Sequence, residues 1–236
     1  MTKQGIDQAE KETILSRSFI FEALDPPIRR ELAGLAQTRR FKAGEPIFDT
    51  GGPGHNMMAV AEGTVRISLI TPTAREVVLA ELNKGEVFGE IALLDGGERS
   101  ADAWALTNCV LITLERRSFL PVLMRDPTLA VRLIELLCTR IRRSDERMIE
   151  FSFLDLPSRL AKAVLRACEN ESGRGMAPKA KLTLSQTELA NMIGSSRENV
   201  NRCLRKWQAS KVVDLKEGWL IILDRDGLEA LAGNAR

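Results

Sequence analysis

The stretch SQTELANMIGSSRENVNRCLRKW, residues 185–207, has the pattern of two short helices joined by a tight turn. Ser185 and Glu188 have the spacing of a capping box, which predicts that a helix starts at Ser185. Gly194 ends this helix, and Ser196 can cap a second one. The apolar residues of the second helix share one face; they are Val200, Leu204 and Trp207. Two short helices joined by a glycine turn form a helix-turn-helix unit.

The remaining faces of the second helix carry side chains that suit base edges. Arginine can bind guanine O6 and N7 with two hydrogen bonds, and glutamate can accept one from cytosine N4. The candidate DNA-contacting residues are Ser196, Arg197, Glu198, Asn201 and Arg202. A solvated helix face would have a similar composition. The apolar segments 211–213 and 219–223, separated by a turn at 216–218, favour DNA binding because they predict a β-hairpin wing after the second helix.

Charge is distributed unevenly along the 236 residues. Residues 155–236 contain 14 basic and 10 acidic side chains, a net charge of +4, whereas residues 1–154 have a net charge of −2. A basic C-terminal third suits double-stranded DNA as a partner. An excess of this size is also common in segments that bind nothing charged, so charge alone decides little.

The N-terminal half has the pattern of an all-β domain. Short apolar or alternating runs recur, with glycines between them, at residues 45–48, 57–61, 64–69, 76–82, 101–105 and 110–114. Many short strands with glycine turns are typical of a barrel or jelly roll. Asp25, followed by two prolines, predicts the N-cap of a short helix over residues 28–35.

A long helix is predicted from Asp126-Pro127 to about Phe153. Its apolar stripe alternates spacings of three and four, which is typical of a coiled-coil seam; the stripe consists of Ile134, Leu137, Ile141, Ser144, Met148 and Phe151. The same helix of a second copy would give a homodimer. The alternative is that the stripe packs on the chain's own barrel.

Beyond this helix, Asp155 predicts the N-cap of a helix through residues 159–168, and the polar segment 169–179 predicts a loop. The sequence therefore predicts an α+β protein with three parts: an N-terminal barrel domain over residues 1–125, a dimerisation helix over 126–154 and a winged helix-turn-helix domain over 155–236.

A second motif lies at VFGEIALL, residues 87–94, followed by Arg99-Ser100-Ala101. Gly89 lets the backbone approach a ligand closely, and a helical turn starting at Glu90 would direct free N–H groups at an anion. Arg99 and Ser100 add donors for a phosphate. Glu90 repels a phosphate, so we expect it to accept a hydrogen bond from a ribose hydroxyl. The alternative is a simple Glu90–Arg99 salt bridge.

These motifs carry a family resemblance. Gly89-Glu90-Ile91-Ala92 with Arg99-Ser100-Ala101 resembles the phosphate-binding cassette of cyclic-nucleotide-binding domains, and residues 195–202 (SSRENVNR) resemble the recognition helix of the cyclic AMP receptor protein group. Their order and the long helix between them extend the resemblance from about Leu15 onward. The chain is thereby identified as a member of the CRP/FNR superfamily of transcription regulators.

The resemblance implies a jelly-roll barrel that binds cAMP or cGMP as an allosteric effector. It implies a ligand set of Gly89, Glu90, Ile91, Ala92, Arg99, Ser100, Ser144 and Asp145, with Glu90 on the ribose, Arg99 and Ser100 on the cyclic phosphate, and Ser144 on the base. It also implies a homodimer that reads a palindrome of TGTGA-type half-sites through Arg197, Glu198 and Arg202 and that works with RNA polymerase.

The sequence departs from the family pattern at three positions. Asp145 replaces a hydroxyl residue beside Ser144. An ionised carboxylate only accepts hydrogen bonds, and guanine offers two adjacent donors, so this exchange favours cGMP more than in relatives with two hydroxyls. The alternative is that Asp145 points to solvent or pairs with Arg142 or Arg143, and that cAMP is the main effector. Asn199 and Asn201 differ from the family's recognition helix, which leaves the exact operator open.

Other functional classes find little support in the composition. Cys109, Cys138, Cys168 and Cys203 lie far apart, and His55 is the single histidine, so we expect no metal, haem or iron–sulfur cluster and no catalytic residue set. No apolar run is long enough to span a membrane, and residues 1–11 lack the apolar core of a signal peptide, so we expect a cytoplasmic protein without a membrane partner.

Three alternative functions remain open. The first is a regulator of the same fold with another effector or none. The second is a regulatory subunit of an enzyme or ion channel that uses the cyclic-nucleotide domain, against which the segment 185–223 argues. The third, a redox protein, is disfavoured by the cysteine spacing.

Overall fold

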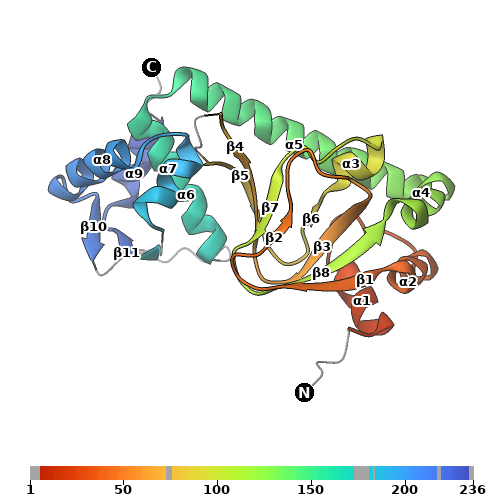
Figure 1. Ribbon diagram of the computed structural model, residues 1–236. Helices are drawn as coiled ribbons and strands as arrows, with labels where there is room; N and C mark the ends of the chain where they lie inside the picture. Colours follow the sequence, from red (N-terminus) through yellow and green to blue (C-terminus); the bar gives the residue numbers. More distant parts are fainter. Residues whose placement is uncertain (1–5, 73–75, 173–180, 183, 217–218, 234–236) are drawn as a thin grey trace. The chain divides into compact units, whose positions relative to one another are not determined.

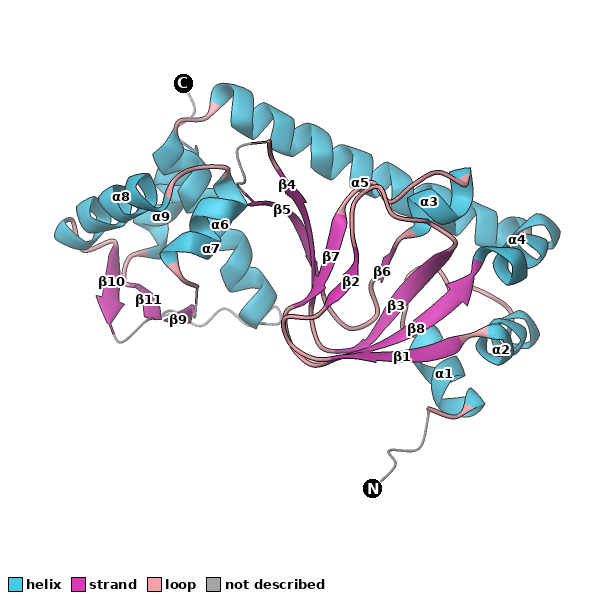
Figure 2. Ribbon diagram, viewed as in Figure 1, coloured by secondary structure: helices cyan, strands magenta, loops and turns pink. Residues whose placement is uncertain are grey.

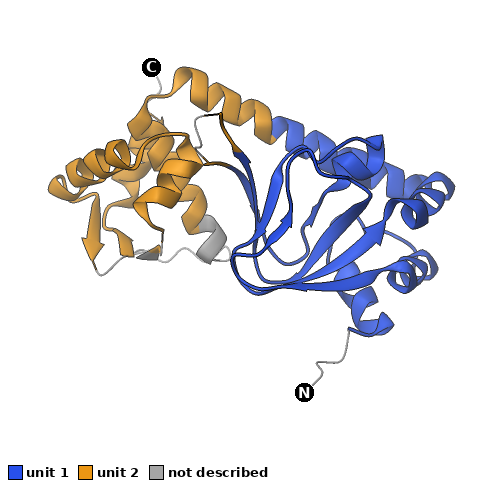
Figure 3. Ribbon diagram, viewed as in Figure 1, with its two compact units in different colours: residues 1–69, 78–142 blue, residues 70–77, 143–236 orange. Residues whose placement is uncertain are grey.

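The computed structural model describes residues 6–72, 76–172, 181–182, 184–216 and 219–233. Packing divides the chain into two compact units (Figure 3): residues 1–69 with 78–142, and residues 70–77 with 143–236. The boundary falls within the long helix α5 (Pro127–Phe153), so the first half of this helix belongs to one unit and the second half to the other.

The first unit is built on two four-stranded antiparallel sheets, as the predicted jelly roll requires (Figure 2). One sheet has the order β1-β8-β3-β6 and the other β2-β7-β4-β5. The strands are β1 (Gln37–Phe41), β2 (Pro46–Phe48), β3 (Asn56–Glu62), β4 (Val65–Ile70), β5 (Glu76–Leu82), β6 (Val87–Phe88), β7 (Asp102–Ala105) and β8 (Cys109–Glu115).

Residues 57–61 of strand β3 form a continuous apolar run because both faces of this strand are covered. Met58 and Val60 pack in the core between the two sheets, whereas Met57, Ala59 and Ala61 pack on the opposite face against helices. Side chains alternate between the two faces of a strand, so a strand that is covered on both faces must be apolar throughout.

The helices of the first unit cover the outer face of the β1-β8-β3-β6 sheet. They are α1 (Gln8–Leu15), α2 (Pro26–Leu35), α4 (Arg116–Arg125) and the start of α5, and α3 (Glu90–Asp95) follows β6 (Figure 1). The sequence predicted α2, α3 and α5 but not α1 or α4. Asp25 is the N-cap residue of α2 and prolines occupy the first two helical positions, as predicted, although the Asp25 side chain makes no capping hydrogen bond. Asp126 does cap α5: its Oδ1 accepts from the Thr128 amide at 2.8 Å.

Strands β1 and β6 were also missed. Strand β1 has the sequence QTRRF and lies at the end of the described sheet, paired with β8, so it is an edge strand with mostly exposed side chains. An edge strand with charged side chains lacks the alternation that marks a half-buried strand. Strand β6 has only two residues, too few for a period.

The second unit contains the C-terminal domain. Its elements are α6 (Leu156–Ser172), β9 (Lys181–Leu182), α7 (Gln186–Ile193), α8 (Arg197–Ala209), β10 (Val213–Lys216), β11 (Trp219–Ile222) and α9 (Arg225–Gly233), and its sheet has the order β10-β11-β9. Asp155 caps α6 as predicted, since its Oδ1 accepts from the Ser158 amide at 2.9 Å. The loop predicted from residue 169 is wrong at its start, because α6 continues through Ser172; residues 173–179 lie outside the described residues.

Within the described ranges, none of the helices combines the length and apolar character that a membrane span requires.

Candidate functional site

Gly89 and Glu90 join strand β6 to helix α3. Gly89 has φ +77°, a left-handed conformation that favours glycine, and a Cβ added there would lie 2.6 Å from Arg99 Nη1. Glu90 begins α3, and its side chain is only 1% exposed. Arg116 stabilises the other end of α3 by donating to the carbonyls of Leu93 and Leu94. The sequence therefore places a carboxylate in the interior of the barrel and fixes the short helix that carries it.

Arg99 lies next to this carboxylate and is 4% exposed. Its backbone pairs with the turn at Gly51-Gly52: Arg99 N donates to Gly52 O, and Gly51 N donates to Arg99 O, both at 2.9 Å. Its guanidinium lies 4.1 Å from the centre of the Phe48 ring. Burial lowers the pKa of Arg99, and the negative charge of Glu90 acts in the opposite direction. The guanidinium is a buried cation held at a defined position.

Two polar atoms of this site are buried and have no hydrogen-bond partner among the described residues: Arg99 Nε and Glu90 Oε2. One is a donor and the other an acceptor. Leaving such a buried atom unpaired costs about 1–3 kcal/mol, so a molecule that supplied an acceptor to Arg99 Nε and a donor to Glu90 Oε2 would complete the hydrogen bonding here. A ligand that carries both an anionic oxygen and a hydroxyl group matches the pair.

Arg140 is a residue of this site that the sequence did not identify. From the first half of α5 it donates to the Glu90 carboxylate and to the carbonyl of Val87. A sequence signal did exist, because Arg140 lies four residues before Ser144, one turn away on the same face of a continuous helix.

The structure therefore brings together Glu90, Arg99 and Arg140, while the other predicted ligand residues are placed as follows. Ala92 is buried and Ile91 is exposed, both in the first turn of α3, and Ser100 is exposed. Ser144 and Asp145 are exposed on the part of α5 that belongs to the second compact unit. The roles of Ser144 and Asp145 stay predictions.

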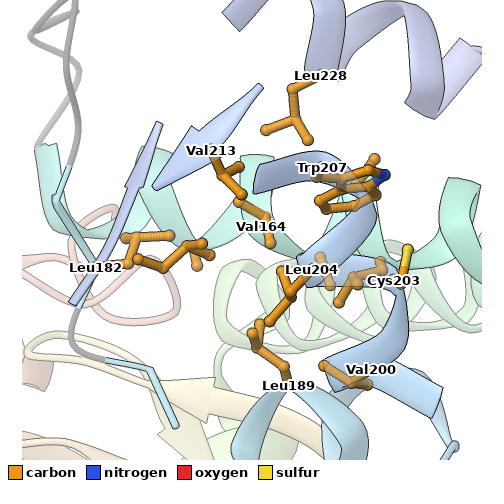
Figure 4. Packing of buried hydrophobic residues seen from close by; sticks show 14 of the residues in the cluster. Val164, Leu182, Leu189, Val200, Cys203, Leu204, Trp207, Val213 and Leu228 are labelled. Carbon is orange, nitrogen blue, oxygen red and sulfur yellow. The ribbon is translucent and has the colours of Figure 1, made fainter. Parts of the chain in front are cut away.

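The helix-turn-helix has the local structure that the sequence predicted. Ser185 and Glu188 form the capping box at the start of α7, and Gly194 ends α7 in the left-handed conformation, with φ +60°. Ser196 Oγ accepts from the Asn199 amide at the start of α8. Helix α8 is fixed by its apolar face, which packs on α6, α7 and the wing (Figure 4); this face consists of Val200, Cys203, Leu204 and Trp207.

The polar face of α8 is open to solvent at the residues predicted to read bases. Arg197, Glu198 and Arg202 are exposed. Asn201 is half-buried, and its Oδ1 accepts from Gln186 Nε2 of α7 at 3.4 Å, so this side chain also joins the two helices. The wing follows as β10 and β11, which pair in antiparallel register from Val213 with Ile222 to Lys216 with Trp219. Residues 217–218 of its predicted turn lie outside the described residues.

The chain matches two family models. Residues 38–126 match the cyclic nucleotide-binding domain, and residues 158–231 match the Crp-like helix-turn-helix domain. Glu90 and Arg99 lie in the first range, and the exposed face of α8 lies in the second. Ser144 and Asp145 lie between the two.

The chain is also similar to proteins of known function and structure. It is 36% identical to the cyclic AMP receptor protein of Thermus thermophilus over 196 residues, which cover 83% of this chain and 88% of that protein. It is 28% identical over 226 residues to a CRP-like cAMP-activated global transcriptional regulator of Mycobacterium tuberculosis, covering 95% of this chain and 100% of the relative. The crystal structure of a CRP/FNR-family transcriptional regulator from Thermus thermophilus matches with a TM-score of 0.72 and 29% identity, covering 85% of this chain and 100% of that chain.

Proposed function

The chain belongs to the CRP/FNR superfamily of transcription regulators, and from this premise we propose that it is a homodimer in which cAMP or cGMP controls binding to a palindromic DNA operator. A cyclic-nucleotide-binding domain and a DNA-binding domain in one chain make it a ligand-responsive regulator rather than an enzyme. We propose a functional division into a nucleotide-binding domain over residues 1–125, a dimerisation helix over 126–154 and a DNA-binding domain over 155–236.

The observation that carries the effector proposal is the pair of buried, unpartnered atoms at Arg99 Nε and Glu90 Oε2. A cyclic nucleotide has a phosphate anion and a free 2′-hydroxyl on the same sugar. The phosphate oxygen would accept from Arg99, and the hydroxyl would donate to Glu90. A free carboxylate or a sugar without phosphate would satisfy only one of the two atoms.

The remaining contacts of the phosphate follow from the start of α3. Gly89 leaves the space beside Arg99 open, since a side chain there would collide with the guanidinium. The first N–H groups of a helix have no acceptor within the helix, so the amides of Ile91 and Ala92 can donate to the ligand. The exposed hydroxyl of Ser100 is a further donor.

The base would be recognised from α5. Ser144 lies one turn after Arg140 on that helix, and its hydroxyl can donate or accept, so it suits adenine and guanine alike. Asp145 only accepts when ionised, which favours guanine. The names of the relatives favour cAMP as the main effector. We expect both nucleotides to bind, and the Kd ratio of cAMP to cGMP should shift in Asp145→Ser if Asp145 contacts the base.

The dimer proposal rests on the apolar stripe of α5. Ile134, Ile141 and Met148 recur every seven residues, and their exposed fractions are 59%, 60% and 64%. A stripe of this spacing is what a second copy of the same helix covers in a coiled coil. Because Arg140 and Ser144 lie on this helix, a bound ligand would influence how the two copies pair, and with it the spacing of the two recognition helices.

The DNA proposal assigns base contacts to the exposed side chains Arg197, Glu198 and Arg202 on α8, with Ser196 and Asn201 beside them. Arginine and glutamate at these positions suit guanine and cytosine in TGTGA-type half-sites. We further propose that the protein acts in the cytoplasm, where it meets its operator and RNA polymerase.

The direct test is calorimetric titration of the purified protein with cAMP and cGMP separately, with 5′-AMP as the control ligand. The proposal predicts saturable binding of at least one cyclic nucleotide and much weaker binding of 5′-AMP, whose phosphate is not joined to the 3′ oxygen. Absence of binding by both cyclic nucleotides would favour a regulator of the same fold with a different effector or none.

A further inference from the structure

The carboxamide of Asn56 is bonded to the guanidinium of Arg99, although 43 residues separate the two in sequence. Arg99 Nη2 donates to Asn56 Oδ1 at 2.8 Å, and Arg99 Nη1 donates to the Asn56 carbonyl at 2.8 Å. Asn56 is the first residue of β3, so its backbone is fixed by pairing with Glu115 on β8. One residue therefore accepts from both terminal nitrogens of the arginine.

Among the residues that the structure describes, the other contacts of Arg99 leave one edge of the guanidinium unoccupied. The second hydrogen of Nη1 is directed to the Gly89 carbonyl at 3.0 Å, and the Phe48 ring covers one face. A guanidinium has five N–H donors in a fixed planar fork. With the edge between Nη1 and Nη2 occupied by Asn56, the free donors are Nε–H and the remaining hydrogen of Nη2. These two point in the same direction and match two oxygens of a phosphate.

We propose that Asn56 is a positioning residue for the effector: it holds Arg99 so that the Nε–Nη2 edge is presented to the cyclic phosphate. This inference rests on the proposed function and adds a residue that the cassette motif does not contain. Without the Asn56 side chain, Nη2 loses its acceptor, and the planar guanidinium can turn as a unit about the Cγ–Cδ and Cδ–Nε bonds. Arg99 keeps its positive charge in this variant, but the orientation of its guanidinium toward the phosphate is less defined.

The distinguishing property is the stereochemistry of phosphate recognition. In the Rp and Sp phosphorothioates of cAMP, a sulfur replaces one or the other exocyclic oxygen. An arginine held edge-on should discriminate between them, because sulfur is a poorer hydrogen-bond acceptor. A residue that only stabilises the barrel changes both affinities by the same factor, whereas a positioning residue changes their ratio.

The experiment measures the Kd of both phosphorothioates by calorimetry for the parent protein and three variants. Asn56→Ala should weaken cAMP binding about tenfold, the effect of one charge-assisted hydrogen bond, and should bring the Rp to Sp ratio several-fold closer to one. Asn56→Asp keeps an acceptor of the same shape, so the ratio should stay near the parent value while both affinities fall, because the added carboxylate repels the phosphate. Asn108→Ala is the matched control, since Asn108 Oδ1 accepts from the Ala43 amide and not from an arginine.

Each outcome decides the inference. An unchanged ratio in Asn56→Ala, or an equal change in Asn108→Ala, would overturn it while leaving the proposed function intact. An Rp to Sp ratio of Kd values near one in Asn56→Asp would also contradict it. This near-isosteric variant serves as the test if Asn56→Ala does not fold. A parent protein that binds no cyclic nucleotide would overturn both the inference and the proposed function.

Discussion

Arg140 of α5 donates to the buried carboxylate of Glu90, fifty residues earlier in the chain, and to the carbonyl of Val87. The contact ties the first half of the long helix to the residue proposed to bind the ribose. Glu90 is 1% exposed, whereas the Arg140 side chain is partly open to solvent. A ligand that binds beside Glu90 therefore lies close to the Arg140 side chain of α5.

Replacement of Arg140 by methionine should lower the stability of the barrel. The change leaves Glu90 as a buried charge without its cation, which costs about 2–3 kcal/mol once the exposure of the arginine is considered. The melting temperature from calorimetry measures this. The double variant with Glu90→Gln should recover part of the loss, because the uncompensated charge is removed; equal melting temperatures for the single and double variants would contradict this account.

Charge placed in the seam of α5 should abolish the proposed dimer. Ile141→Lys and Met148→Lys each bring like charges together across a two-fold axis, so the sedimentation coefficient should fall to that of a monomer. Operator binding should be lost with it. Glu146→Lys, an exposed position on another side of the helix, is the matched control and should stay dimeric. Intact dimers in both seam variants would mean that another surface joins the copies.

Arg202 and Lys206 lie one turn apart on α8 and should differ in what they contact. Arg202→Ala should lose about 1–3 kcal/mol on the preferred operator and relax the preference at one base pair. Lys206→Ala should weaken specific and random DNA alike, with a smaller salt dependence. Fluorescence anisotropy with both duplexes separates the two behaviours, and an equal loss on both duplexes for Arg202→Ala would assign it to phosphate.

Alkaline pH should destabilise the C-terminal unit through Cys203. Burial raises the pKa of this thiol to about 11, and the nearby Lys206 opposes the shift. An unfolded cysteine has a pKa of about 8.5, so above that pH the unfolded chain releases a proton that the folded chain retains. The folded state has its full stability below pH 8.5 and loses roughly 3 kcal/mol as pH rises from 8.5 through 11.

The measurement is the urea midpoint between pH 7 and pH 11 for the parent and Cys203→Ala, whose midpoint should fall less steeply with pH. Cys138→Ala, which replaces a cysteine outside the C-terminal core, should follow the parent. If Cys203→Ala also follows the parent, this thiol does not cause the alkaline loss.

The sequence predicted the elements whose residues repeat with a clear period. The strands of the barrel and the helix α5 have apolar residues at spacings of two or of three and four. Helices α7 and α8 also begin at capping serines, and α7 ends at Gly194. Edge strand β1 was not predicted from the sequence because most of its side chains are polar or charged and exposed. Helix α4 was not predicted because it contains Pro121, and proline is disfavoured in the interior of a helix.

Part of the candidate site was also beyond sequence reasoning. Glu90 and Arg99 belong to one short motif, so their proximity follows from a single turn of chain. Arg140 and Asn56 come from α5 and β3, more than forty residues from their partners. Only the folded barrel brings these segments together, and an arginine on a helix or an asparagine at a strand start has many ordinary uses.

Control of DNA binding by the nucleotide site can be measured in one anisotropy titration. A labelled duplex with two TGTGA-type half-sites is titrated with the protein in the presence and absence of saturating cAMP, and again with Arg99→Leu. Allosteric coupling of about 1–3 kcal/mol predicts that cAMP changes the DNA Kd of the parent by roughly 5- to 150-fold and that Arg99→Leu loses this response. A DNA Kd that cAMP leaves unchanged in a parent protein shown to bind it would contradict the account.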